Sequence, residues 1–227
     1  MDIISDKDVW EFITPEDLWI YDKLILSKKL NYNCGPAGVD PKTPGEYIIR
    51  PCVNFRMMGH GASIMHLVPG NSENIPHGYF WCEMFTGRHL SFDYHHGVQC
   101  LAVEGFRDDP YNLSRFSRWT KVEETFILPS FLQEVAVKYE WLNIEVIGNH
   151  IIEVHLRYND DFRNHDGDTI IPIWKENFYP SVCDDRIGFI VQRSRSINGD
   201  AAGCKSAASG TLGSIPRRRK TYFKRSL

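Results

Sequence analysis

Four side chains that could bind a metal ion and an anion lie close together in residues 143–157. This stretch reads as two short strands that meet at Gly148-Asn149, a pair that supplies positive φ in tight hairpins. The four side chains are Glu145, Glu153, His155 and Arg157. Side chains alternate faces along a strand, so the last three share one face, and the turn returns the first beside them. Two carboxylates and an imidazole suit a divalent cation, and arginine suits phosphate or carboxylate oxygens.

The same alternation also has a purely structural interpretation. A half-exposed antiparallel hairpin alternates polar and apolar residues whether or not it binds anything. On this hairpin the apolar face would carry Ile152, Val154 and Leu156. The hairpin alone therefore does not decide between a strand pair and a metal site.

Length and composition indicate a globular protein. The 227 residues are 42% hydrophobic with a net charge of -3, which excludes wholesale disorder and gives no overall attraction to nucleic acid or membrane. The six cysteines form no CxxC pair, the first residues lack the pattern of a secretory signal, and no apolar run approaches the ~20 residues that cross a bilayer. We therefore expect free thiols and a soluble, cytoplasmic protein without a membrane partner.

Apolar spacing and turn residues predict the elements that position these side chains. A helix is expected over residues 5–30, with Thr14 and Pro15 as a start signal. Its apolar stripe would be Leu18, Tyr21, Leu24 and Ile25. The other expected elements are a strand at 46–50 closed by Pro51, a glycine loop at 56–63, an apolar strand at 79–85, a turn at 86–89, strands at 90–94 and 98–105, and a helix at 129–140.

The composition changes from about Ser194. A segment rich in glycine, alanine and serine leads to a basic terminus at 216–225. We expect a solvated tail, and contact with nucleic acid or a partner protein is the alternative for it.

Taken in order, three segments resemble the ATP-grasp superfamily of carboxylate ligases. Tyr47-Ile-Ile-Arg-Pro51 with Gly59-His-Gly-Ala62 resembles the strand that ends in a nucleotide-contacting cation and runs into a phosphate-covering loop. Residues 80–93 resemble the hinge strand between the two lobes. Residues 144–157 resemble the magnesium hairpin, which in the family has an acidic residue on its first strand and Glu-x-Asn-x-Arg on its second. The resemblance covers roughly residues 15–160.

This resemblance implies an α+β fold in which two α+β lobes with antiparallel sheets enclose a nucleotide cleft. Residues 1–80 would form the N-terminal lobe with the phosphate loop. Residues 81–193 would form the C-terminal lobe with the hinge strand and the magnesium hairpin, followed by a basic, flexible tail at 194–227. Family members normally carry a further N-terminal domain, so the chain is expected to be a minimal form.

The resemblance also implies a role for each candidate residue. The residues implied to bind the nucleotide are Lys23, Arg50, Gly59, Gly61, Glu83, Met84, Phe85 and His89. Those implied to hold Mg²⁺ are Glu145, Glu153 and His155. The implied catalytic residues are Arg50 and Arg157, with Arg157 facing the transferred phosphate or an acyl phosphate.

Two positions depart from the family pattern. His155 stands where the family has asparagine, and imidazole is a poorer magnesium ligand than an amide oxygen, which makes Mn²⁺ a second candidate ion. Arg50 stands where lysine is expected and still suits phosphate. Lys23 lies close to Lys28 and Lys29, so an exposed surface lysine is an equal alternative for it.

The sequence thus predicts an ATP- and Mg²⁺-dependent ligase that joins a small-molecule or peptide carboxylate to an amine through an acyl phosphate. A nucleotide-binding protein of the same fold without turnover, serving in interaction or regulation, is the first alternative. A histidine-dependent metalloenzyme of another fold is the second. The sequence leaves a homo-oligomer open.

Overall fold

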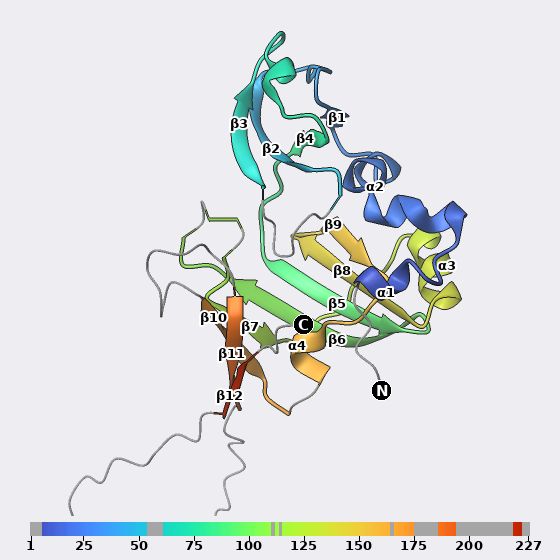
Figure 1. The fold of residues 1–227 in the computed structure, drawn as a ribbon, viewed down its shortest axis with the longest axis vertical. Helices are drawn as coiled ribbons and strands as arrows, with labels where there is room; N and C mark the ends of the chain where they lie inside the picture. The colour runs from blue at the N-terminus through green and yellow to red at the C-terminus, as the bar shows by residue number, and fades with distance from the viewer. Residues whose placement is uncertain are drawn as a thin grey trace, which may run out of the picture.

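The computed structural model describes residues 6–53, 61–109, 112–113, 115–163, 166–174, 186–193 and 220–223. Within them lie two antiparallel β-sheets, a four-stranded one and an eight-stranded one, joined by helices and loops. The small sheet lies above the large sheet, with the helices α1, α2 and α3 on one side (Figure 1). The expected α+β class with antiparallel sheets is therefore confirmed.

The small sheet has the strand order β1-β4-β2-β3. Its strands are β1 (Cys34–Pro36), β2 (Gly45–Pro51), β3 (Ser63–Leu67) and β4 (Tyr79–Glu83), with the short 3₁₀ helix η2 (Ser72–Asn74) between the last two. Its own core consists of Tyr47, Ile49, Leu67, Ile75 and Trp81. As expected from the sequence, the four cysteines in the described residues are free thiols.

The large sheet has the strand order β12-β11-β10-β7-β6-β5-β8-β9. Its strands are β5 (His89–His95), β6 (Val98–Phe106), β7 (Arg118–Lys121), β8 (Trp141–Ile147), β9 (His150–His155), β10 (Thr169–Trp174), β11 (Arg186–Gln192) and β12 (Lys220–Phe223). Strand β12 differs from the expected tail, because it pairs with β11 at the sheet edge. The rest of that expected tail lies outside the described residues.

The predicted single helix over residues 5–30 is wrong, although a helix does begin after Thr14 with Pro15 at its first position, as expected. The structure has three short pieces there, namely α1 (Asp6–Val9), the 3₁₀ helix η1 (Pro15–Tyr21) and α2 (Lys23–Lys29). Asp22 has extended backbone angles, and its carboxylate accepts hydrogen bonds from the amides of Leu24 and Ile25 at 2.9 and 3.0 Å. This cap starts a new helix with a different face, so Leu18 and Ile25 of the expected stripe are exposed.

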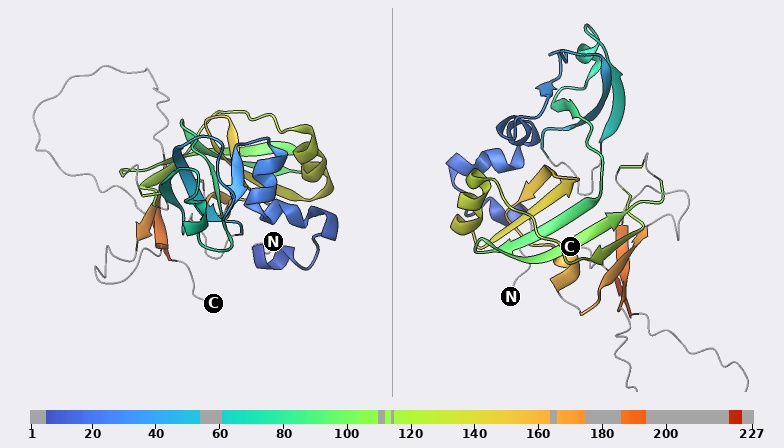
Figure 2. Two further views of the ribbon diagram at one scale, coloured as in Figure 1. Left: turned by 90° about the horizontal axis from the view of Figure 1, so that it is seen from above. Right: turned by 180° about the vertical axis from the view of Figure 1, so that it is seen from behind.

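The remaining helices, α3 (Ser130–Lys138) and α4 (Asp160–Arg163), lie on the large sheet. Helix α3 begins after Pro129, as the sequence predicts, and buries Leu132, Val135 and Ala136 against the sheet's apolar face. In both views of Figure 2, the N-terminal helices α1, η1 and α2 and the helix α3 lie at the end of the large sheet that carries β9. No helix of the described residues is long and apolar enough to span a membrane.

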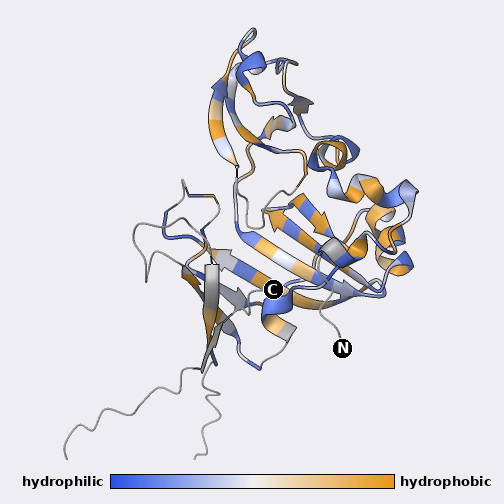
Figure 3. Ribbon diagram, viewed as in Figure 1, coloured by the Kyte–Doolittle hydropathy of each residue, from blue (hydrophilic) through white to orange (hydrophobic). Residues whose placement is uncertain are grey.

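Strand β5 separates a core face from a polar face. Leu90, Phe92 and Tyr94 belong to the main core, whereas the alternate residues His89, Ser91 and Asp93 are buried polar groups. Figure 3 shows this alternation as changing colours along β5, β8 and β9. The polar face is the one that carries the candidate site.

The predicted hairpin is confirmed as β8 and β9. Glu145 lies directly opposite Glu153, and Gly148 has φ +60 at the turn. A β-bulge after Glu145 shifts the register, so Ile151 faces the core where the sequence predicts Ile152. The glutamate pair lies on the unshifted side of this bulge.

The chain passes once from the small sheet to the large one between Glu83 and His89. This linking segment runs against the hairpin turn, where the amide of Gly148 donates to the carbonyl of Arg88 at 2.9 Å. A Cβ atom at Gly148 would lie 2.7 Å from the carbonyl oxygen of Thr86, and one at Gly87 would lie 2.8 Å from the Cα of Gly148. Both positions therefore need glycine for the close approach.

We predict that Gly148→Ala destabilises the protein more than Gly78→Ala does. Both glycines have positive φ, but a Cβ at Gly78 has nothing within 4 Å. The added clash with Thr86 should make the difference about 1–3 kcal/mol in the free energy of unfolding, measured by chemical denaturation. Equal losses in the two variants would contradict the close packing of the linking segment.

Candidate functional site

Three potential metal ligands lie close together on the polar face of the strands β8 and β9. The ligand atoms of Glu145, Glu153 and His155 all lie within 4.8 Å of one another. Donor atoms around one octahedral ion with bonds of about 2.1 Å lie roughly 3–4 Å apart, so the set is slightly open. Two carboxylates and one imidazole therefore fit a divalent cation by chemistry and by spacing.

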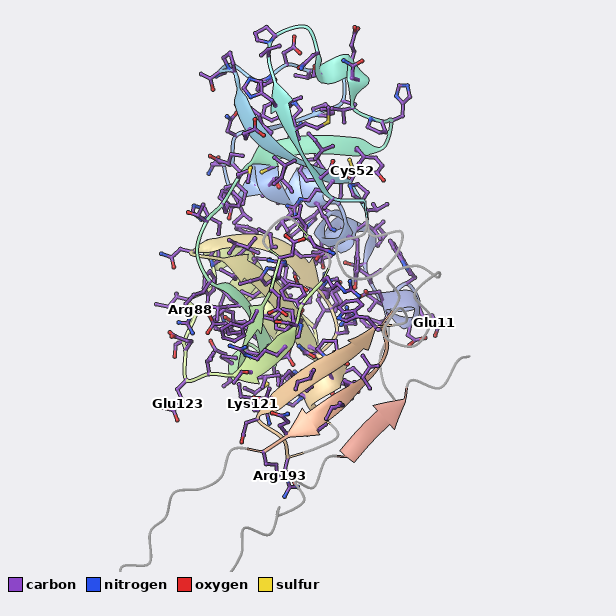
Figure 4. All side chains as sticks on the ribbon, turned by 90° about the vertical axis from the view of Figure 1, so that its left-hand side faces the viewer. Glu11, Cys52, Arg88, Lys121, Glu123 and Arg193 are labelled. Carbon is purple, nitrogen blue, oxygen red and sulfur yellow. The ribbon has the colours of Figure 1, made fainter. Side chains whose placement is uncertain are left out.

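Glu153 is paired with Lys23. The Nζ atom of Lys23 lies 2.6 Å from Oε1 of Glu153, and the two side chains form an ion pair. Lys23 is only 5% exposed, so the alternative of a surface lysine is wrong. Its amide donates to the carbonyl of Cys52 at 2.7 Å, and Figure 4 shows Cys52 beside α2, where the small sheet meets the helices. Lys23 thus connects the end of β2, the start of α2 and the hairpin.

The electrostatic surroundings keep Glu153 ionised. Burial acts to raise the pKa of its carboxyl group, but the charges of Lys23, His155 and Arg50 outweigh burial and lower the pKa well below 4.5. Ionisation of this group therefore depends on cations supplied by the helices and by the small sheet.

Arg50 is a buried cation at the end of β2. It is 8% exposed, its guanidinium lies 5.3 Å from the ring centre of Phe80, and its Nε has no hydrogen-bond partner in the described residues. A buried charge with an unsatisfied donor is costly. An anion bound near Arg50 would supply the missing acceptor.

Glu145 is held from the other side by His89. Nε2 of His89 lies 3.1 Å from Oε2 of Glu145, and Nη2 of Arg107 lies 3.1 Å from Nδ1 of His89. Arginine can only donate, so Nδ1 is the acceptor and Nε2 carries the hydrogen that it donates to Glu145. Burial raises the pKa of Glu145, but the hydrogen bond from His89 and nearby charges leave it below its ordinary value.

His89 is placed differently from the sequence prediction. It was expected in the turn 86–89 and among the nucleotide-binding residues, but it begins β5 opposite Ile147 and is buried. The reason is that the strand pairing starts one residue earlier than the predicted 90–94.

His155 and Arg157 share one carboxylate. Oδ1 of Asp6 lies 3.2 Å from Nδ1 of His155 and 2.9 Å from Nε of Arg157. Burial raises the pKa of Asp6, but these two partners lower it to about 2. An ionised carboxylate only accepts, so Nδ1 of His155 carries the hydrogen and Nε2 is the nitrogen left for a metal.

The polar face continues below the site as a buried network. The side-chain amide of Asn143 donates to Ser91 Oγ and to Asp93 Oδ1, both at 2.8 Å. The other oxygen of Asp93 accepts from the amide of Asn159 at 2.9 Å. These bonds fix β8 against β5 and anchor the chain that leaves the hairpin.

The other candidates lie apart from this cluster. Glu83 ends β4, and its Oε1 accepts from the amide of Asn33 at 2.8 Å. Met84 is exposed, while Phe85 stacks on His150 with ring centres 4.1 Å apart. Gly61 packs near the hydroxyl group of Tyr79. Gly59 lies outside the described residues, as does most of the predicted phosphate loop.

Sequence reasoning missed Asp6 and Arg107. Asp6 lies 149 residues before the histidine that it contacts, and Arg107 lies 18 residues after His89. Neither belongs to a local pattern, so only the sheet order and the path of the first helices bring them to the site. The sole hint was that unpaired charges are rarely buried.

The solved structures that the chain resembles are ATP-grasp proteins. An L-amino acid ligase from Bacillus licheniformis aligns with a TM-score of 0.42 and 11% identity, covering 64% of this chain and 42% of that one. D-alanine–D-alanine ligase from Bacillus anthracis aligns at 0.37 and 15%, covering 60% and 56%. The ATP-grasp ligase PsnB with a minimal precursor aligns at 0.39 and 12%, covering 65% and 53%.

The chain thus spans about half the length of these structures. No protein-family model matches the sequence, and no curated protein does. No residue of this chain takes a role from these structures.

We predict that Lys23→Met lowers the free energy of unfolding by about 3 kcal/mol at pH 7, because it leaves Glu153 buried without its cation. The lowered pKa of Glu153 means that its stabilising effect is full above pH 4.5 and fades as the pH falls toward the folded-state pKa. The difference between wild type and variant, measured by denaturation, should therefore shrink below about pH 4.5.

The exposed Lys28 on the same helix gives the control, and Lys28→Met should change stability by less than about 0.5 kcal/mol. The double variant Lys23→Met/Glu153→Gln should recover part of the loss. Additive losses from the two single substitutions would argue against the ion pair.

Proposed function

We propose that the chain binds ATP with a divalent cation between its two sheets and joins a carboxylate to an amine. The observation that carries this proposal is the convergence of Glu145, Glu153 and His155 beside the buried cations Lys23 and Arg50. Phosphoryl transfer requires carboxylates that bind a metal ion and, next to them, cationic side chains that bind the phosphates. The order of the three segments in the sequence that resemble ATP-grasp ligases supports the same class.

The cationic side chains would take the phosphate oxygens. Arg50 has a free buried donor, and Lys23 would exchange its contact with Glu153 for a phosphate oxygen. A bound divalent ion would neutralise phosphate charge next to the carboxylates. The nucleotide would extend toward the linking segment, where Glu83 and the backbone of Met84 and Phe85 would meet adenine and ribose. Gly59 and Gly61 would border the phosphates.

The proposed reaction has two steps. A carboxylate oxygen of the substrate attacks the γ-phosphorus of ATP, the bond to the ADP oxygen breaks, and an acyl phosphate forms. An amine then attacks the acyl carbon, phosphate leaves, and the nitrogen loses a proton to give the amide. Arg157, oriented by Asp6, would stabilise the acyl phosphate. His89 would orient Glu145 and would not contact the nucleotide directly.

We predict that ATP binding depends on a divalent cation and that Glu153→Gln weakens it by about tenfold or more. Calorimetry on the full chain with Mg²⁺, with Mn²⁺ and with chelator would measure this. Glu46→Gln is the matched control, because Glu46 is an exposed glutamate of the small sheet and should leave binding unchanged. Equal ATP affinity with and without metal would contradict the proposed site.

Turnover would be tested separately by ADP release in mixtures of carboxylates and amines. Release that needs both substrates supports the ligase. Metal-dependent ATP binding with no ADP release from any mixture would favour the alternative of a nucleotide-binding protein without turnover.

A further inference from the structure

The three candidate ligands are each held by a different partner. Glu145 accepts from His89, Glu153 is paired with Lys23, and His155 donates to Asp6. The first two contacts leave carboxylate oxygens as ligands, which any hard divalent cation accepts. The third contact leaves Nε2 of His155 as a nitrogen ligand, and this nitrogen determines which metal ions the site can prefer.

We propose that this site selects a first-row transition ion, with Mn²⁺ as the ion that tests it, over Mg²⁺, and that Asp6 is the positioning residue for the nitrogen ligand. The inference rests on the proposed metal and nucleotide site and names its ion. Mg²⁺ takes oxygen ligands almost exclusively, whereas transition ions also bind imidazole nitrogen.

The orientation of His155 favours coordination through Nε2. The ring is 4% exposed at the end of β9, and it contacts Tyr21 edge-on with ring centres 6.5 Å apart. Because Asp6 accepts from Nδ1, the lone pair lies on Nε2. A carboxylate on the remote nitrogen of a ligating histidine fixes its tautomer and makes it a better donor, and losing such a partner typically costs about 10–100-fold in metal affinity.

Asp6 also connects the metal ligand to the anion-binding residue. The same oxygen accepts from Nε of Arg157, so the imidazole and the guanidinium are oriented by one group. A nitrogen ligand and an arginine are thus positioned together on the edge of the sheet.

Metal selectivity is measured on the full chain by Mn²⁺ electron paramagnetic resonance, with Mg²⁺ as competitor, with and without a non-hydrolysable ATP analogue. We expect wild type to bind Mn²⁺ at least about tenfold more tightly than Mg²⁺ and to show ¹⁴N modulation from a directly bound imidazole in pulsed spectra. His155→Asn, which restores the ATP-grasp pattern, should lose that modulation and lower the preference for Mn²⁺ by about tenfold.

Asp6→Asn should keep the ¹⁴N modulation but weaken Mn²⁺ binding by about tenfold, because an amide is a weaker acceptor than a carboxylate. Glu11→Gln, at an exposed acidic residue just after α1, is the matched control and should change neither quantity. Absence of ¹⁴N modulation in wild type, or an unchanged metal preference in His155→Asn, would overturn the inference.

The two proposals fail in different ways. Imidazole-bound Mn²⁺ without any ATP binding would leave the metal inference standing and remove the ligase proposal. ATP binding that requires Mg²⁺ as strongly as Mn²⁺, with no ¹⁴N signal, would do the reverse.

Discussion

The charge of two facing, partly buried carboxylates is the constraint on which this structure depends. Glu145 and Glu153 lie directly opposite each other on β8 and β9, where like charges repel. Both are nevertheless kept ionised, because Lys23 and His89 reach them from opposite sides. Breaking such pairs leaves uncompensated charge away from water, which typically costs several kcal/mol. The path of the N-terminal segment and the start of β5 are therefore set by charge as well as by apolar packing.

The same contacts protect the edge of the large sheet. Strand β9 ends the sheet and would expose unpaired backbone groups, but η1 and α2 pack against it and the hydroxyl group of Tyr21 accepts from the amide of Leu156 at 3.2 Å. Asp22 starts α2 at the point where Lys23 can reach the hairpin. The turn of the chain at Asp22 thus has three effects. Asp22 caps α2, the helices around it cover the edge strand β9, and Lys23 is brought to Glu153. A continuous helix over residues 5–30 could not do all three.

The sequence predicted what is local and missed what depends on distant segments. Period-two alternation and Gly148-Asn149 were enough to place Glu145, Glu153 and His155 together, because a hairpin fixes its own register. The β-bulge was not visible in that pattern, which is why the core residue is Ile151. Asp6 and Arg107 reach the site only through packing between elements far apart in the chain. The helical spacing of apolar residues from Leu18 to Ile25 led to the wrong prediction of one helix, because the capping aspartate Asp22 starts a new helix within that stripe.

The charge balance around the site argues for an occupant that is anionic overall. Among the described residues whose contacts are given above, four cationic side chains adjoin three carboxylates, so the formal charges of these seven groups sum to a positive value. The cations are Lys23, Arg50, Arg107 and Arg157, and the carboxylates are those of Asp6, Glu145 and Glu153. A bare divalent ion adds to this excess, whereas an ion bound to a polyphosphate reverses it. On the proposed function, metal and nucleotide would bind with positive cooperativity, because each would supply the charge that the other needs. Without a ligand, the ion pair between Lys23 and Glu153 neutralises the carboxylate that the proposed metal would occupy. On the same proposal, the ammonium group of Lys23 would move to a phosphate oxygen when metal and nucleotide bind together.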